Sequence, residues 1–60
     1  MNKVYYVLLK NDEGTTMTIP IYGALSTGFA LTSALSMVFP SDKDKLIGLK
    51  IDRIEDVEEE

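Results

Sequence analysis

Histidine and cysteine are both absent from this 60-residue chain. Without them, no Ser–His or Cys–His pair can activate a nucleophile, and a zinc site of the usual type cannot be built. Disulfide bonds are excluded as well, and the lack of cysteine is compatible with a reducing cytoplasm. The chain also has no glycine-rich phosphate-binding motif. We therefore expect a cytoplasmic protein that is not an enzyme and that holds neither a metal nor a cofactor.

Carboxylate pairs are present, but in segments that do not favour catalysis. Asp12 precedes Glu13, and Asp42 lies two residues before Asp44, each pair within a polar stretch. No apolar residues surround them that would shift a pKa or exclude water, as acid–base catalysis requires. We interpret both pairs as parts of solvated turns.

Basic residues are too few for direct contact with nucleic acid. Six lysines and arginines stand against ten acids, which gives a net charge of -4. Binding to a phosphate backbone requires an excess of basic side chains. The charge instead favours a basic partner, such as the DNA-binding face of another protein.

The length predicts one domain, residues 1–60, that is only marginally stable by itself. A chain of this size buries about 60% of the surface that its unfolded form exposes. Small scaffolds therefore add disulfides, a metal site or oligomerisation. Because the first is excluded and no metal site of the His/Cys type is possible, we expect a homodimer.

Three segments have the composition of β-strands. Lys3–Lys10 is rich in β-branched and aromatic residues and apolar on both faces, which is typical of a central strand. A polar turn at 11–14 leads into Thr15–Tyr22, where Pro20 predicts either an edge strand or the end of the strand. Leu46–Ile54 alternates apolar and polar residues and forms the third strand.

The segment Ala24–Phe39 is predicted to be a helix, and it carries no charge. A helical wheel groups one apolar stripe that should face the sheet: Ala24, Gly28, Leu31, Leu35, Val38 and Phe39. The opposite side then holds Leu25, Phe29, Ala30 and Met37, with Ser26, Ser33 and Ser36 between them. A helix without charge all round is usually buried all round.

These elements predict an α+β fold in the order ββαβ. Short connections of alternating direction place the third strand beside the first, which gives an antiparallel sheet of order 2-1-3 with the helix on one face. Pro40 should end the helix, and residues 41–45 should form a solvated turn. Residues 55–60 are expected to be a frayed acidic tail.

The uncharged helix has three possible explanations. In the first, it forms a dimer interface whose two helices also line a groove for a partner; the interface residues would be Leu25, Phe29, Ala30, Ser33 and Met37. In the second, it belongs to a small core and is merely poor in charge. In the third, Ile19–Phe39 crosses a membrane, but Pro20, Gly23 and the many hydroxyl residues argue against that.

Two further features are candidates for partner contacts. Phe29 and Met37 could grip an apolar side chain of a partner, or simply pack against the second subunit. The acids at 52, 55, 56 and 58–60 could imitate the phosphates of DNA, or form a tail that aids solubility.

Two segments resemble a known family. Val7–Gly14, VLLKNDEG, is an apolar strand followed by an acidic turn that ends in glycine. Val38–Ile54 contains LIGLKIDRI, which is particularly close to the last strand of that family. In these segments the chain is similar to the small uracil-DNA glycosylase inhibitors of small tailed Bacillus phages.

The resemblance implies a dimeric ββαβ protein that imitates DNA. Two helices would frame an apolar groove for the loop that the glycosylase inserts into DNA, and nearby acids would face the enzyme's basic channel. By position, Leu35 and Phe39 fall on aromatic residues of the family, and Ser36 replaces an important Glu. A second alignment places Phe29 on the family's Phe and Ala30 on that Glu.

In both alignments the acid is missing, so Asp52 or the acids at 55–60 would have to replace it. The expected partner-binding residues are Phe29, Leu35, Ser36, Met37, Phe39, Asp52, Glu55 and Asp56. The leading hypothesis is an inhibitor of host uracil-DNA glycosylase that acts in the host cytoplasm. The alternative is a small dimeric structural or adaptor protein of a phage or mobile element, with no enzyme target.

Overall fold

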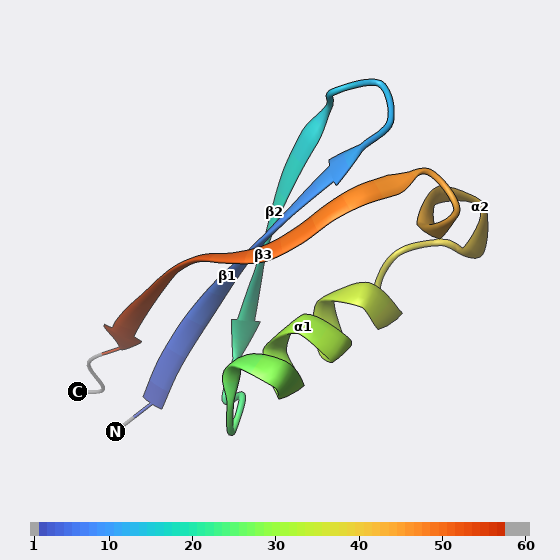
Figure 1. The fold of residues 1–60 in the computed structure, drawn as a ribbon. Helices are drawn as coiled ribbons and strands as arrows, with labels where there is room; N and C mark the ends of the chain where they lie inside the picture. Colours follow the sequence, from blue (N-terminus) through green and yellow to red (C-terminus); the bar gives the residue numbers. More distant parts are fainter. Residues whose placement is uncertain (1, 58–60) are drawn as a thin grey trace.

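The computed structural model describes residues 2–57 and contains three strands and two helices (Figure 1). In chain order these are β1 (Asn2–Asn11), β2 (Thr16–Tyr22), α1 (Thr27–Ser36), α2 (Pro40–Lys43) and β3 (Leu46–Val57). The three strands form one antiparallel sheet of order β2-β1-β3. This confirms the predicted α+β fold and the central place of β1.

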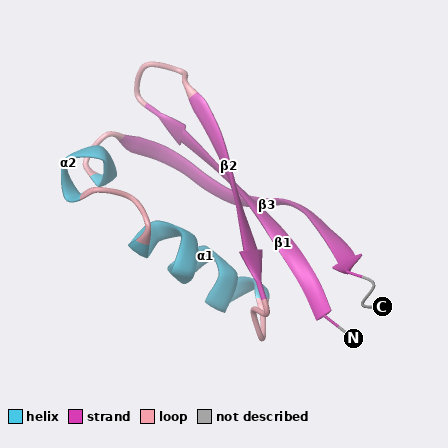
Figure 2. Ribbon diagram, turned by 180° about the vertical axis from the view of Figure 1, so that it is seen from behind, coloured by secondary structure: helices cyan, strands magenta, loops and turns pink. Residues whose placement is uncertain are grey.

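One face of the sheet is covered by α1, and the other carries no helix (Figures 1 and 2). Alternate residues of β1, namely Tyr5, Val7 and Leu9, are buried on the covered face. They pack in one core with Ala30 and Ala34 of α1, both of which are 0% exposed. Because alanine is small, the helix can lie close to the sheet at these two positions.

The rotation of α1 about its axis differs from the prediction. Ala30, expected on the outward side, is buried against the sheet, whereas Gly28, expected on the sheet, is exposed. Leu31 and Val38, also expected there, do pack in the core, and the exposed Phe39 lies beyond the end of α1. The helical wheel could not predict which side of α1 faces the sheet, because apolar and small residues occur all round this helix. Close packing of the two alanines on the sheet selects the observed rotation over one that buries the larger side chains.

The ends of α1 also lie inside the predicted limits. Ser26 is the N-cap, and its Oγ accepts a hydrogen bond of 3.2 Å from the backbone N–H of Phe29. Pro40 does not precede a turn but starts α2, where it occupies the first helical turn. Proline fits there because the N–H that it lacks would have no partner within the helix.

The strand β3 is longer than predicted and contains a bulge. It ends at Val57, so the expected fraying is wrong for residues 55–57, which pair with β1; residues 58–60 lie outside the described part. Tyr6 pairs with Arg53 and Val7 with Ile51, which leaves Asp52 as the extra residue. The bulge shifts the alternation of side chains by one position.

The turn between β1 and β2 is stabilised by the side chain of Asn11, the last residue of β1. Asn11 Oδ1 accepts hydrogen bonds from the backbone N–H groups of Glu13 and Thr15, at 3.0 and 2.9 Å. Gly14 has a φ of 84°, which a residue with a side chain rarely adopts. Pro20 lies within β2, which is an edge strand of the sheet. Of the two predictions for Pro20, an edge strand or the end of the strand, the first is confirmed.

Neither described helix has both the length and the apolarity that a transmembrane span demands.

Candidate partner-binding surfaces

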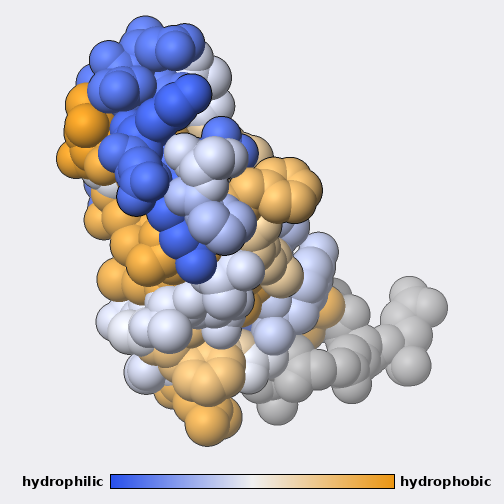
Figure 3. Space-filling view, turned by 90° about the vertical axis from the view of Figure 1, so that its right-hand side faces the viewer, coloured by the Kyte–Doolittle hydropathy of each residue, from blue (hydrophilic) through white to orange (hydrophobic). Residues whose placement is uncertain are grey.

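Exposed apolar side chains lie along α1 and beyond both of its ends. Leu25 is 88% exposed, Phe29 53%, Met37 64% and Phe39 74%. We call these four residues the α1 surface. Figure 3 shows hydrophilic residues gathered at one end of the molecule, and hydrophobic side chains emerging over much of the remaining surface of this view. Large apolar groups exposed together in this way are typical of interaction sites.

Two hydroxyl groups of α1 are already hydrogen-bonded within the helix. The Thr32 hydroxyl donates to the carbonyl of Gly28 at 3.0 Å, and the Ser36 hydroxyl donates to the carbonyl of Ser33 at 2.7 Å. A buried hydroxyl is costly mainly when it has no hydrogen-bond partner. Covering this side of the helix would therefore leave these two donors satisfied.

The predicted site residues on and beside α1 fall into three groups. Phe29, Met37 and Phe39 are exposed, as a docking role requires, and so is Ser36 at the last helical position. Ser33 and Leu35 are half-buried. Ala30 is inaccessible because the sheet of the same subunit covers it, so its assignment to a dimer interface is wrong.

The sheet face opposite α1 carries a second set of side chains, which we call the open face. By strand register it consists of Val4, Tyr6, Leu8 and Lys10 of β1, Thr16, Thr18, Pro20 and Tyr22 of β2, and Lys50, Arg53, Glu55 and Val57 of β3. Val4 is buried, Tyr6, Leu8 and Val57 are half-buried, and the other members are exposed.

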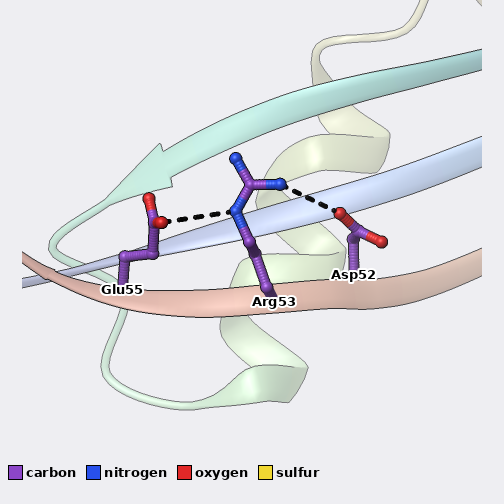
Figure 4. A network of polar contacts seen from close by, with 3 residues as sticks. All are labelled: Asp52, Arg53 and Glu55. Atoms are coloured by element: carbon purple, nitrogen blue, oxygen red, sulfur yellow. Dashed lines mark hydrogen bonds and ion pairs between the residues drawn. The ribbon is translucent and has the colours of Figure 1, made fainter.

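Arg53 is the centre of a polar cluster on this open face (Figure 4). Its Nη1 lies 3.4 Å from Asp52 Oδ2, and its Nε lies 3.5 Å from Glu55 Oε2. Its guanidinium carbon lies 4.1 Å from the centroid of the Tyr6 ring, within cation–π range. One cation therefore contacts two carboxylates and covers an aromatic ring.

The environment of Tyr6 alters its titration. A hydrogen bond with the Glu55 carboxylate is the largest cause that raises the pKa of the Tyr6 hydroxyl, and desolvation and the negative charge of Glu55 add to it. Arg53 acts in the opposite direction. The raised pKa means that the cluster favours the neutral phenol.

The sequence contained one sign of this cluster that the predictions did not use. Apolar residues alternate at 47, 49 and 51, and the next one is Ile54, three positions later. Such a step of three in a strand is the mark of a bulge, and the bulge turns Arg53 toward Tyr6. The contact itself depends on the register between β1 and β3.

The predicted acidic residues do not lie on one surface. Glu55 is opposite Val4 on the open face, whereas Asp56 is opposite Lys3 on the side of the sheet that α1 covers. Asp52 and Glu55 both contact Arg53. The predicted partner-binding set is thus divided between two faces of the sheet.

Within residues 2–57, no group of His, Cys, Asp or Glu side chains could hold a metal ion. Comparison of the chain with models of protein families, with curated proteins and with solved structures found no match.

Proposed function

We propose that this protein is a non-enzymatic inhibitor that binds the DNA-binding face of a uracil-DNA glycosylase as a homodimer. The observation that carries the proposal is the α1 surface, where large apolar side chains are exposed on and beside a helix without charge. The resemblance of Val7–Gly14 and Val38–Ile54 to small inhibitors of that enzyme supports the choice of partner. The ββαβ order agrees with that resemblance.

The homodimer follows from the size of the domain. A chain of 60 residues cannot cover α1 on all sides with its own sheet. A second copy would remove apolar area from water at about 25 cal/mol per Å². We assign the interface to Leu25, Phe29, Ser33 and Met37. Ala30, which the sequence predicted there, is excluded because it is buried against the sheet. The space between the two helices would receive an apolar side chain of the enzyme.

Electrostatics supports a basic partner. The net charge of -4 opposes direct binding of DNA and favours the basic channel of a DNA-binding enzyme. Because α1 carries no acid, we assign this role to the acids of β3 and of the segment after it. Inhibition by occupation of the channel would compete with DNA and involve no turnover. We place this action in the cytoplasm of a host cell.

The test is an excision assay. The purified protein is mixed with a uracil-DNA glycosylase and a uracil-containing duplex, at increasing ratios of protein to enzyme. We expect excision to fall to zero near stoichiometric addition, and added duplex to restore it by competition. Undiminished excision at a clear excess of the protein would refute the proposal.

A second candidate is a dimeric structural or adaptor protein without an enzyme target. One observation favours it: Asp52 and Glu55 are held by Arg53, so two of the expected DNA-mimicking charges already have a cation beside them. Reversal of the charges at 55, 56 and 58–60 separates the candidates. It should weaken an inhibitor and leave the self-association of an adaptor unchanged, as measured by light scattering with and without the enzyme.

A further inference from the structure

The strand β3 is less buried than its place in the fold predicts. Three of its apolar side chains, Leu49, Ile51 and Ile54, lie on the side of the sheet that α1 covers, since their partners in β1 are core residues. No residue of β3 is buried, however, and Leu49 and Ile54 are 37% and 45% exposed. The strand order gives β3 a neighbour on one side only. β3 is therefore an edge with partly exposed apolar side chains along it.

The two edges of the sheet differ in their capacity to pair with a further strand. An edge strand presents backbone donors and acceptors to any strand that approaches. β2 has 7 residues and contains Pro20, which has no N–H to donate. β3 has 12 residues and no proline. Pairing is thus restricted at β2 and open at β3.

The bulge of β3 selects a second copy of the same strand as the partner. A bulge on an edge usually opposes pairing with foreign strands, but a second copy carries the same bulge. In an antiparallel pair centred between Asp52 and Arg53, the two bulges lie opposite each other. Residues 48–57 then meet residues of their own face, and Ile51 lies opposite Ile54 of the second copy on the α1 side.

Charge complementarity favours this register. Lys50 of each copy lies opposite Glu55 of the other on the open face, so unlike charges meet twice. Registers centred on Lys50 or on Arg53 would instead place like charges opposite each other. A register centred on Ile54 opposes unlike charges, but the bulge limits its matched part to residues 53–55.

We propose that two copies of this chain join through their β3 strands into one continuous antiparallel sheet, with both α1 helices on the same face. This inference rests on the proposed function, to which it adds the geometry of the homodimer. The two-fold axis that relates two antiparallel strands is perpendicular to the sheet, so it preserves the faces and closes after two copies. Pro20 then lies in the outermost strands, where it restricts further growth of the sheet.

The joined sheet determines the spacing of the two helices. α1 packs over β1 through Ala30 and Ala34, and three strand spacings separate the two copies of β1. At about 4.8 Å each, these amount to about 14 Å, whereas helices in direct contact lie about 8–10 Å apart. The wider spacing leaves a groove between the helices, with Leu49 and Ile54 of both copies at its base. The interface residues that we assign to α1 would meet across this groove.

The experiment exchanges the charges of the proposed cross-copy pair. Lys50→Glu and Glu55→Lys each place like charges opposite each other in a homodimer, whereas a mixture of the two variants restores unlike charges in the heterodimer. Within one copy the two residues are about 16 Å apart along the strand, so the exchange acts only between copies. Analytical ultracentrifugation measures the dissociation constants. We expect each variant alone to dimerise about tenfold more weakly than the parent, because two symmetric pairs change sign, and the mixture to recover to within about twofold.

Lys10→Glu is the matched control, because it makes the same charge change on the open face of the central strand. It should dimerise within about twofold of the parent, and its mixture with Glu55→Lys should contain no excess of heterodimer. Thermal unfolding of each variant verifies that the fold is kept. Isotope-filtered NMR of the parent should show a contact between Ile51 of one copy and Ile54 of the other.

The outcomes separate this inference from the proposed function. A dimeric parent without the contact between copies, or a mixture of Lys50→Glu and Glu55→Lys that associates no better than its components, would overturn the inference while the proposed function stands. A parent that is monomeric at every concentration would instead refute the proposed homodimer, and the inference with it.

Discussion

The two faces of the sheet cover their apolar and aromatic side chains in different ways. On the α1 side, Tyr5, Val7 and Leu9 are buried beneath a helix that leaves its own outer side apolar. On the open face no helix covers Tyr6, and Arg53 lies over its ring. One side thus carries exposed apolar side chains on and beside α1, and on the other a charged side chain lies over Tyr6 but not over Tyr22, which is 70% exposed. The α1 side is the one that we propose a partner covers.

The largest expected effect compares two neighbouring leucines of β1. Leu9 is 1% exposed on the α1 side, and Leu8 is half-buried on the open face. Leu9→Ala should lower the free energy of unfolding by about 2–5 kcal/mol, since it leaves a cavity in the core. Leu8→Ala should cost about 1 kcal/mol because part of its surface is already in water. Urea denaturation of both variants measures the difference, and equal losses would contradict the contrast between the faces.

The next effect concerns self-association. Phe29→Asp places a charge on the α1 surface, and we expect it to convert the proposed dimer into a monomer. The dissociation constant should rise by a factor of about 30 or more, the effect of a hot-spot residue. Thr18→Asp on the open face is the control with the same added charge. Mass in solution, by light scattering over a range of concentration, gives both values. A Phe29→Asp variant that remains dimeric would move the interface away from α1.

The sequence was sufficient for the fold because its strong signals were local. Alternation in Thr15–Tyr22 and Leu46–Ile54, two apolar faces in Lys3–Lys10, and Pro20 together determined the element types and the strand order. Each depends on the period of side chains along one segment, which is written in the sequence.

The features that the sequence did not predict depend on contacts between segments. The rotation of α1 depends on how Ala30 and Ala34 meet Tyr5, Val7 and Leu9, and a helix without a polar side gives no sign of it. The extension of β3 through Glu55 and Asp56 depends on pairing with β1, which overrides the solvated character of an acidic segment. The pleat separates Glu55 from Asp56, and the bulge at Asp52 determines which face each of them takes. The candidate site was therefore predicted as a set of residues, without its division into two surfaces.

The smallest expected effect tests the polar cluster of the open face by pH. Because the folded state raises the pKa of Tyr6 above the ordinary value of 10.0, it holds the phenol proton more firmly than the unfolded chain does. The contribution to stability is therefore complete below pH 10 and is lost as the pH rises through the higher pKa of the folded state. Urea denaturation on both sides of pH 10 should show this fall, and Tyr6→Phe should reduce it. Glu55→Gln removes the largest cause of the shift, so the Tyr6 titration, followed by ultraviolet absorbance as the difference from Tyr6→Phe, should move to lower pH. A Tyr6 titration that Glu55→Gln leaves in place would mean that desolvation, rather than Glu55, raises the pKa of Tyr6.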